Sequence, residues 1–122
     1  MPYKKMISLA TLRQMALSFP ETTEKPHFEK TSFRVKNKIF VTYDAVNNQA
    51  CIKLSEIDQN VFSLVNKEAI FPVPNKWGKQ GWTFVKLNLV GSEIFADALT
   101  TAYCGIAPKI LSERVKQNYN NE

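Results

Sequence analysis

Residues 32–43, with the sequence SFRVKNKIFVTY, decide the fold because they predict two β-strands joined by a tight turn. Polar and apolar residues alternate in the first strand, 32–35, which is the period of a half-buried strand. The second strand, 39–43, consists of β-branched and aromatic residues, which favour strands. Asn37 stands between them and tolerates the left-handed backbone of a tight turn. The stretch therefore predicts a β-hairpin.

Similar signals occur after this hairpin. Asn47-Asn48 marks another turn, and polar and apolar residues then alternate again. Further strands are therefore expected at residues 49–54 and 82–89. The prolines within residues 71–74 predict an extended and irregular segment, and the glycines within residues 76–81 predict a loop.

Apolar residues at helical spacing predict helices elsewhere in the chain. Ser8, Ser55 and Ser92 are suitable N-caps. Val61, Phe62 and Val65 form the apolar side of the second of these helices. The expected helices span residues 8–18 and 55–66, then Ser92 to about Tyr103, where Gly105 interrupts the pattern, and the residues after Pro108. The polar tail, 117–122, is expected to fray.

The order of these elements indicates an α+β fold. Strands that follow one another through short turns pair antiparallel, and the helices between them pack on one face of the sheet. We therefore expect an antiparallel sheet with flanking helices. A chain of 122 residues fits one domain, over residues 1–122, with an ordered core at about residues 8–117.

The composition indicates a soluble protein of a reducing compartment. Apolar residues make up 44% of the chain, which is enough for a core. No stretch approaches the ~20 apolar residues that cross a bilayer. Cys51 and Cys104 are too few for a disulfide framework, and no apolar run follows the basic N-terminus as it would in a signal peptide. We expect a cytoplasmic protein with no membrane partner.

The charge favours anionic partners. Lys and Arg number 16 against 11 Asp and Glu, which gives a net charge of +5. Such a balance suits nucleic acid or another anion, and it also serves ordinary solubility.

No complete catalytic or metal-binding motif is found in the sequence. His27 is the single histidine, so any Ser-His or Cys-His pair would have to use it. One histidine and two scattered cysteines do not make a zinc site. Phosphate-binding and nucleophile-elbow motifs are absent as well. We therefore expect no enzyme activity, no catalytic residues, no metal and no cofactor.

Alternation along the strands predicts that one face of the sheet collects cations and aromatic rings. Phe33 and Val35 point one way, so Arg34 points the other, and Trp82, Phe84 and Lys86 share a side. Phe40 and Thr42 join this face if Ile39, Val41 and Tyr43 point inward. The turn at 36–38 and the loop at 76–79 add cations at its ends. The candidate nucleic-acid-binding residues are Arg34, Lys36, Lys38, Lys53, Lys76, Trp77, Lys79, Trp82, Phe84 and Lys86.

The chemistry of this face suits single-stranded nucleic acid. Cations bind phosphates, and aromatic rings stack on bases. Exposed sheets that combine the two are a known solution for single strands. The alternative is a solvated face on which Lys and Arg stems cover apolar surface.

Several stretches resemble the MmcQ/YjbR family. They are Lys25-Pro26-His27-Phe28, residues 32–40, Gly81-Trp82 before a strand, and Ala102-Tyr103 late in the chain. The resemblance extends from about Ser8 to Lys116. Glu29 and Asn37 depart from the usual pattern, since glycine is common at both positions. The resemblance implies a frataxin-like or secretion-chaperone-like arrangement and a DNA-binding label, with no established catalytic residues.

These observations leave several functions open. The first is a non-catalytic nucleic-acid-binding protein with DNA as its partner. The second is a protein-interaction or chaperone-like domain that uses exposed aromatic residues or an unpaired sheet edge. The third is a small-ligand domain with a pocket around Trp77, Trp82 and His27. The sequence does not distinguish a monomer from a homodimer.

Overall fold

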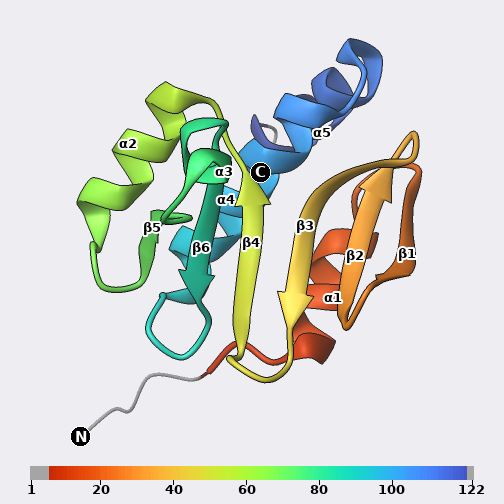
Figure 1. The fold of residues 1–122 in the computed structure, drawn as a ribbon. Helices are drawn as coiled ribbons and strands as arrows, with labels where there is room; N and C mark the ends of the chain where they lie inside the picture. Colours follow the sequence, from red (N-terminus) through yellow and green to blue (C-terminus); the bar gives the residue numbers. More distant parts are fainter. Residues whose placement is uncertain (1–5, 121–122) are drawn as a thin grey trace, which may run out of the picture.

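The computed structural model describes residues 6–120 and the side chains of residues 6–118. Its centre is a six-stranded sheet with the order β1-β2-β3-β4-β6-β5, and every neighbouring pair is antiparallel (Figure 1). The strands are β1 (Thr22–His27), β2 (Lys30–Val35), β3 (Lys38–Asp44), β4 (Gln49–Lys53), β5 (Ile70–Pro72) and β6 (Trp82–Lys86). The predicted α+β fold with an antiparallel sheet is therefore confirmed.

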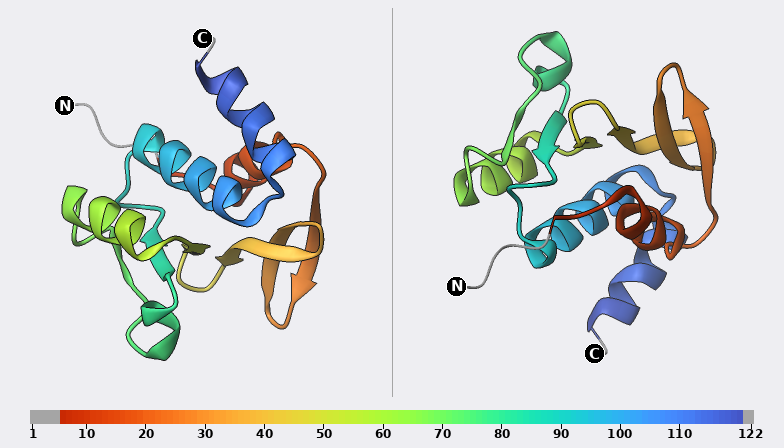
Figure 2. Two further views of the ribbon diagram at one scale, coloured as in Figure 1. Left: turned by 90° about the horizontal axis from the view of Figure 1, so that it is seen from above. Right: turned by 90° about the horizontal axis from the view of Figure 1, so that it is seen from below.

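The helices cover mainly one face of this sheet. They are α1 (Leu9–Leu17), α2 (Glu56–Val65), α3 (Lys76–Lys79), α4 (Ser92–Ile106) and α5 (Lys109–Asn120). Figure 2 shows α4 and α1 on the same side of the sheet, whereas α3 and the β1–β2 hairpin extend from the other side. α2 lies beside the edge strand β5 (Figure 1). The face opposite α4 is called the open face below.

The core lies between α4 and the sheet. Tyr103 and Phe40 are fully buried, and their rings meet edge to face at 5.3 Å. Phe19 stacks on Tyr103 at 4.7 Å. The Tyr103 hydroxyl donates a hydrogen bond to the carbonyl oxygen of Pro20 at 2.7 Å, which joins the segment after α1 to α4. Aromatic rings in these arrangements bury a large apolar area for each residue.

Several expectations about local structure are confirmed. The hairpin has Lys36 and Asn37 at its turn, both with positive φ, and strand β4 follows at Gln49. Ser8 and Ser55 cap α1 and α2, since their hydroxyl oxygens accept bonds from backbone N–H groups in the first turn. Ser92, in contrast, is the first residue of α4, and Gly91 occupies the cap position.

Other expectations were wrong at the sheet edges and in the loops. β1 was not predicted, because most of its residues are exposed and show no alternation. Residues 71–74 were expected to be extended but irregular, whereas residues 70–72 form the regular edge strand β5. Pro72 is tolerated at this edge, and Phe71 lies opposite Phe84 with 5.9 Å between the ring centroids. β6 ends at Lys86 and not at Leu89.

The expected helix boundaries also change. Residues 76–79, expected as a loop, form the short helix α3. α4 continues through Gly105 to Ile106, which packs against the core. α5 includes residues 117–120 of the tail that was expected to fray, and residues 121–122 lie outside the described part. No helix within residues 6–120 has the length and apolar character needed to span a membrane.

Candidate nucleic-acid interface

The open face carries the cations and rings that alternation predicted. Lys53 lies directly opposite Trp82, and Cys51 opposite Phe84. Gln49 lies opposite Lys86. Directly opposed residues of antiparallel strands share one face. The core-facing neighbours in β6, Thr83 and Val85, are fully buried, whereas Trp82, Phe84 and Lys86 are half-buried.

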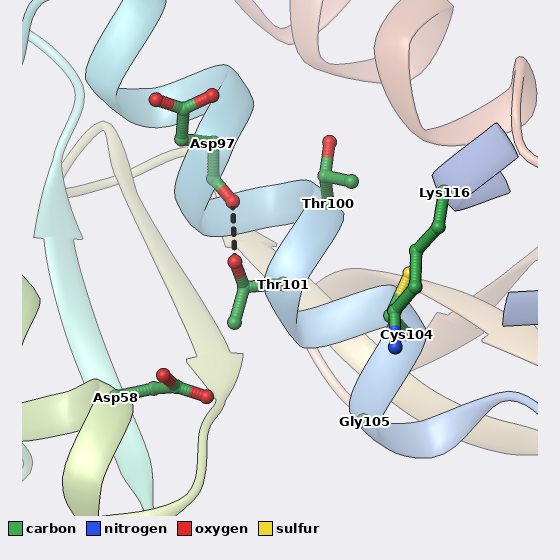
Figure 3. Close-up of a pocket in the computed structure, with 7 residues that line it drawn as sticks. All are labelled: Asp58, Asp97, Thr100, Thr101, Cys104, Gly105 and Lys116. Carbon is green, nitrogen blue, oxygen red and sulfur yellow. Dashed lines mark hydrogen bonds between the residues drawn. The ribbon is translucent and has the colours of Figure 1, made fainter. Parts of the chain in front are cut away.

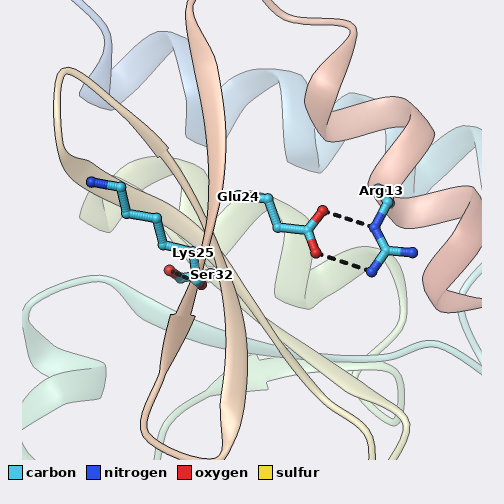
Figure 4. A network of polar contacts seen from close by, with 4 residues as sticks. All are labelled: Arg13, Glu24, Lys25 and Ser32. Carbon is cyan, nitrogen blue, oxygen red and sulfur yellow. Dashed lines mark hydrogen bonds and ion pairs between the residues drawn. The ribbon is translucent and has the colours of Figure 1, made fainter.

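β2 and β1 extend this arrangement. Arg34 is half-buried, and its Nε donates to the Ser32 hydroxyl at 3.0 Å. That hydroxyl donates in turn to the carbonyl oxygen of Lys25 at 2.8 Å. In Figure 4, Glu24 and Lys25 point to opposite sides of β1: Glu24 pairs with Arg13 of α1, and Lys25 points away from that pair. Lys25 therefore adds a cation to the open face.

A β-bulge changes which residues of β3 face outward. The register between β2 and β3 shifts at Phe33/Arg34, so Val41 lies opposite Phe33 and Ile39 lies opposite Arg34. Phe40 is skipped in the ladder and turns into the core. The expected outward position of Phe40 and inward position of Ile39 were therefore wrong. Thr42 lies on the open face as expected, since it is opposite Cys51.

The open face contains a cavity of about 430 Å³. α3 with its preceding loop stands on one side, and the β1–β2 turn on the other (Figure 2). The lining residues are His27, Lys30, Ile39, Thr42, Cys51, Val73, Trp77, Trp82 and Phe84, and none of these is acidic. Trp77, Trp82 and His27 thus lie around one cavity, as the small-ligand hypothesis predicted.

α3 is fixed where Trp77 can form one side of this cavity. The Asn75 side chain caps α3 by accepting from the Trp77 backbone N–H at 2.8 Å. Gly78 packs so closely on residue 73 that an added Cβ would lie 1.9 Å from the Val73 carbonyl oxygen. From α2, the buried Gln59 amide donates to the Gly78 carbonyl oxygen at 2.9 Å and to the Thr83 hydroxyl at 3.0 Å. These contacts hold the indole half-exposed, at 49%.

The candidate cations differ in their environment. The Lys53 ammonium donates to the Gln80 carbonyl oxygen, and Lys76 lies 5.7 Å from the Trp77 ring centroid. Lys36 pairs with Glu21 at 2.6 Å, and its hydrogen bond lowers the pKa of that carboxyl. Lys36 is therefore bound by an acid and lies at the turn with Lys38, away from the cavity lining. Within the described residues, no ion pair involves Arg34, Lys53 or Lys86.

One acid lies at the margin of the open face. Asp44 ends β3, two residues after Thr42, and therefore shares its side of the strand. Its carboxyl accepts from the Asn47 amide at 2.8 Å and from the Val46 backbone N–H at 3.0 Å. The Asn47 bond lowers the pKa of Asp44, and the nearby Lys30 adds to this effect. The carboxylate is thus engaged by its own turn.

Cys51 is a poor nucleophile in this cavity. Burial raises the pKa of its thiol to about 11, so the thiol is protonated at neutral pH. The His27 ring contacts Phe28 edge to face at 4.9 Å. No group of at least three His, Cys, Asp or Glu side chains in the described part of the chain is arranged to hold a metal ion.

Sequence reasoning missed Lys25 and Lys30 on this face. Both belong to the β1–β2 hairpin, in which His27 lies opposite Lys30. Phe28 adopts a positive φ at the turn, which is unusual for an aromatic residue. The sequence places Lys25 and Lys30 on either side of Phe28-Glu29, but β1 lacks the alternation of polar and apolar residues that would indicate a hairpin there.

A second cavity, of about 610 Å³, lies between α2, α4 and α5 (Figure 3). The Thr100 and Thr101 hydroxyls donate to backbone carbonyl oxygens of their own helix. Asp58 and Asp97 come from different helices and do not point toward one another in Figure 3. The residues that line this second cavity are Asp58, Asp97, Thr100, Thr101, Cys104, Gly105 and Lys116. The open face, where rings and cations converge, is the better candidate site.

Comparison with known proteins places the chain in a family. The model of the YjbR family matches residues 17–104. Among solved structures, protein DR2400 of Deinococcus radiodurans, described with the family domain DUF419, is similar with a TM-score of 0.74 at 18% identity, over 91% of this chain and 89% of that one. At this identity the similarity concerns the fold alone. No curated protein matches the chain. This family match covers more than half of the chain and confirms the resemblance noted in the sequence around His27. The protein therefore belongs to the YjbR family.

Proposed function

We propose that the protein binds single-stranded nucleic acid, with DNA as the first candidate, on the open face of its sheet. The observation that supports this function is the cavity lined by Trp77, Trp82 and Phe84, whose lining contains Lys30 and no acidic side chain. A base is flat and apolar on both faces, so it stacks on half-exposed rings. The phosphates that follow it are anions and bind to Lys and Arg.

Each part of the open face has a role in this proposal. Trp77 and Trp82 come from α3 and β6 and provide stacking surfaces on the cavity. Arg34, Lys53 and Lys86 lie on the same face outside the cavity lining, and they contact phosphates. Lys76 and Lys79 on α3 extend the cationic surface beyond it. Lys36 contributes less, because Glu21 neutralises it.

Fluorescence anisotropy of a labelled single-stranded oligonucleotide tests the proposal. If about four phosphates are bound, the logarithm of the affinity falls with the logarithm of salt concentration with a slope of roughly −3, since each phosphate contributes about −0.7. Trp82→Ala weakens binding by roughly five-fold to 150-fold, because one stacked base is lost. Lys86→Ala reduces the slope by about one phosphate contact, whereas Lys109→Ala on α5 leaves it unchanged.

Two results would contradict this function. One is the absence of binding to single-stranded and double-stranded DNA even at low salt. The other is binding that Trp82→Ala and Trp77→Ala leave unchanged while Lys109→Ala weakens it as much as Lys86→Ala does. The second result would reduce the interaction to the net charge of +5.

A small aromatic anion is the second candidate ligand, because Trp77, Trp82 and His27 line one cavity. Its volume of about 430 Å³ lies in the range of small-molecule sites. A mononucleotide tested by thermal shift separates the two candidates. A ligand of this kind raises Tm at millimolar concentration, whereas a site that requires a chain of phosphates shows a rise only with an oligonucleotide.

A further inference from the structure

Helix α2 directs its apolar side to solvent. Ile57, Val61, Leu64 and Val65 recur at helical spacing and form the apolar stripe of α2. Their side chains are 75%, 53%, 71% and 54% exposed. Val61, Phe62 and Val65 were predicted as the apolar side of this helix. The structure places Val61 and Val65 outward, whereas Phe62 is half-buried against the core. An apolar stripe of this size on one helix is typical of an interaction surface.

The inner side of α2 combines polar residues with one aromatic ring, Phe62, which packs against the core. Gln59 is the one residue of α2 that is buried, and it binds α3 and β6 through its amide. The Ser63 hydroxyl is also buried, without a hydrogen-bond partner among the described residues. A helix that serves only the fold of its own chain has the reverse pattern, with the apolar side inward. Gln59 and Phe62 therefore attach α2 to the rest of the chain without the stripe.

We propose that the apolar stripe of α2 binds the same stripe of a second copy, with the two helices antiparallel about a two-fold axis. Charge supports this occupant. The first turn of α2 carries Glu56 and Asp58, and Lys67 follows its last turn. An antiparallel pair places Glu56 of one copy near the partner's Lys67 at both ends of the contact. Neither Glu56 nor Lys67 forms an ion pair within the described chain.

The sheet edges are less suited to such a contact. β1 contains Pro26 together with charged side chains, and β5 has three residues and ends in Pro72. Proline and charge on short edge strands oppose the addition of another strand. None of the stripe residues lines the cavity on the open face, so the dimer leaves that cavity accessible.

Sedimentation velocity of the full chain tests the dimer. Because a contact made by one helix from each copy is small, we expect a monomer–dimer equilibrium between about 1 µM and about 300 µM. Val61→Lys raises the dimer Kd at least ten-fold. Val46→Lys is the matched control, since Val46 is 92% exposed in the β3–β4 turn, and it leaves the Kd unchanged. A circular dichroism melt of each variant confirms that the fold is intact.

A charge exchange tests the antiparallel arrangement. Glu56→Lys and Lys67→Glu each weaken the dimer, and the double variant restores the original Kd, because both ion pairs re-form with reversed signs. A chain that remains monomeric over the whole range overturns the proposal and assigns the stripe to a different protein. A dimer that Val61→Lys does not weaken, or that the double variant does not restore, overturns it as well. Nucleic-acid binding is measured separately, so either proposal can fail alone.

Discussion

Gln59 is the polar residue through which α2 holds α3, and Gln59→Met tests its importance. Methionine keeps the length and approximate volume of glutamine but removes the amide. The variant loses the bonds to the Gly78 carbonyl oxygen at 2.9 Å and to the Thr83 hydroxyl at 3.0 Å. Both acceptors keep another hydrogen bond, since the Gly81 N–H donates to the Gly78 carbonyl oxygen and the Thr83 hydroxyl donates to that of Gly81.

The magnitude follows from the number of bonds lost. A hydrogen bond contributes about 0.5–1.5 kcal/mol net, so two short ones amount to about 1–3 kcal/mol. With a urea m-value of about 1–3 kcal/mol per molar, the midpoint of unfolding falls by roughly 1 M. The third contact, to the Trp82 carbonyl oxygen at 3.3 Å, adds little.

Urea unfolding measures this loss, and hydrogen exchange shows where it acts. Asn60→Met is the control, because Asn60 is exposed on the same helix, and it changes the free energy of unfolding by less than about 0.5 kcal/mol. In Gln59→Met the Gly81 amide, which donates to α3, exchanges faster than in the control. Equal stability of the two variants, or unchanged exchange at Gly81, would refute the role given to Gln59.

Two further predictions concern Gly78 and Cys51. Gly78→Ala lowers the free energy of unfolding by at least ~2 kcal/mol, because the new Cβ would lie 1.9 Å from a backbone oxygen. Gly105→Ala raises the free energy of unfolding by up to ~1 kcal/mol, because its Cβ meets no atom within 4 Å and alanine favours the helix. Urea unfolding of both variants measures the two changes. Burial raises the pKa of the Cys51 thiol to about 11, so iodoacetamide labels it slowly at about pH 8 in a Cys104→Ser background. The labelling rate increases as pH rises toward 11. Because the pKa of the thiol is raised to about 11 in the folded chain from 9.0, the free energy of unfolding declines as pH rises from 9.0 toward 11. Labelling at about pH 8 as fast as in the urea-unfolded chain would contradict this prediction.

The centre of the sheet could be predicted from sequence because its strands alternate. The β2–β3 hairpin and β4 combine alternation with turn residues such as Asn37, and these local signals agree with the final fold. β1 could not be found in this way. It is an edge strand with most residues exposed, so its pairing with β2 depends on backbone hydrogen bonds that leave no apolar pattern.

The candidate site was predictable to the same extent. Trp82, Phe84 and Lys86 lie on the open face because an unbroken strand keeps its period of two. The period fails at Phe40, where the bulge inserts an extra residue that no local feature of the sequence indicates. The position of Trp77 depends on the contact of Gly78 with residue 73 and on Gln59 from another helix, which are tertiary interactions.

The orientation of α2 was also beyond sequence reasoning. An apolar side on a helix indicates that something covers it, but the pattern is the same whether the cover is the chain's own core or another molecule. The informative residue was Gln59, whose burial can be recognised only once its acceptors in α3 and β6 are in place.

The hydrogen bond from Tyr103 to Pro20 has a consequence for biosynthesis. It joins positions 83 residues apart, and the rings of Phe19 and Phe40 pack on the same tyrosine. When a nascent chain has emerged from the ribosome only as far as β6, its strands have no α4 to cover the core face of the sheet. The last step of folding therefore waits until the C-terminal region has left the ribosome, and truncated chains that end before Tyr103 present an uncovered β-sheet to chaperones and proteases.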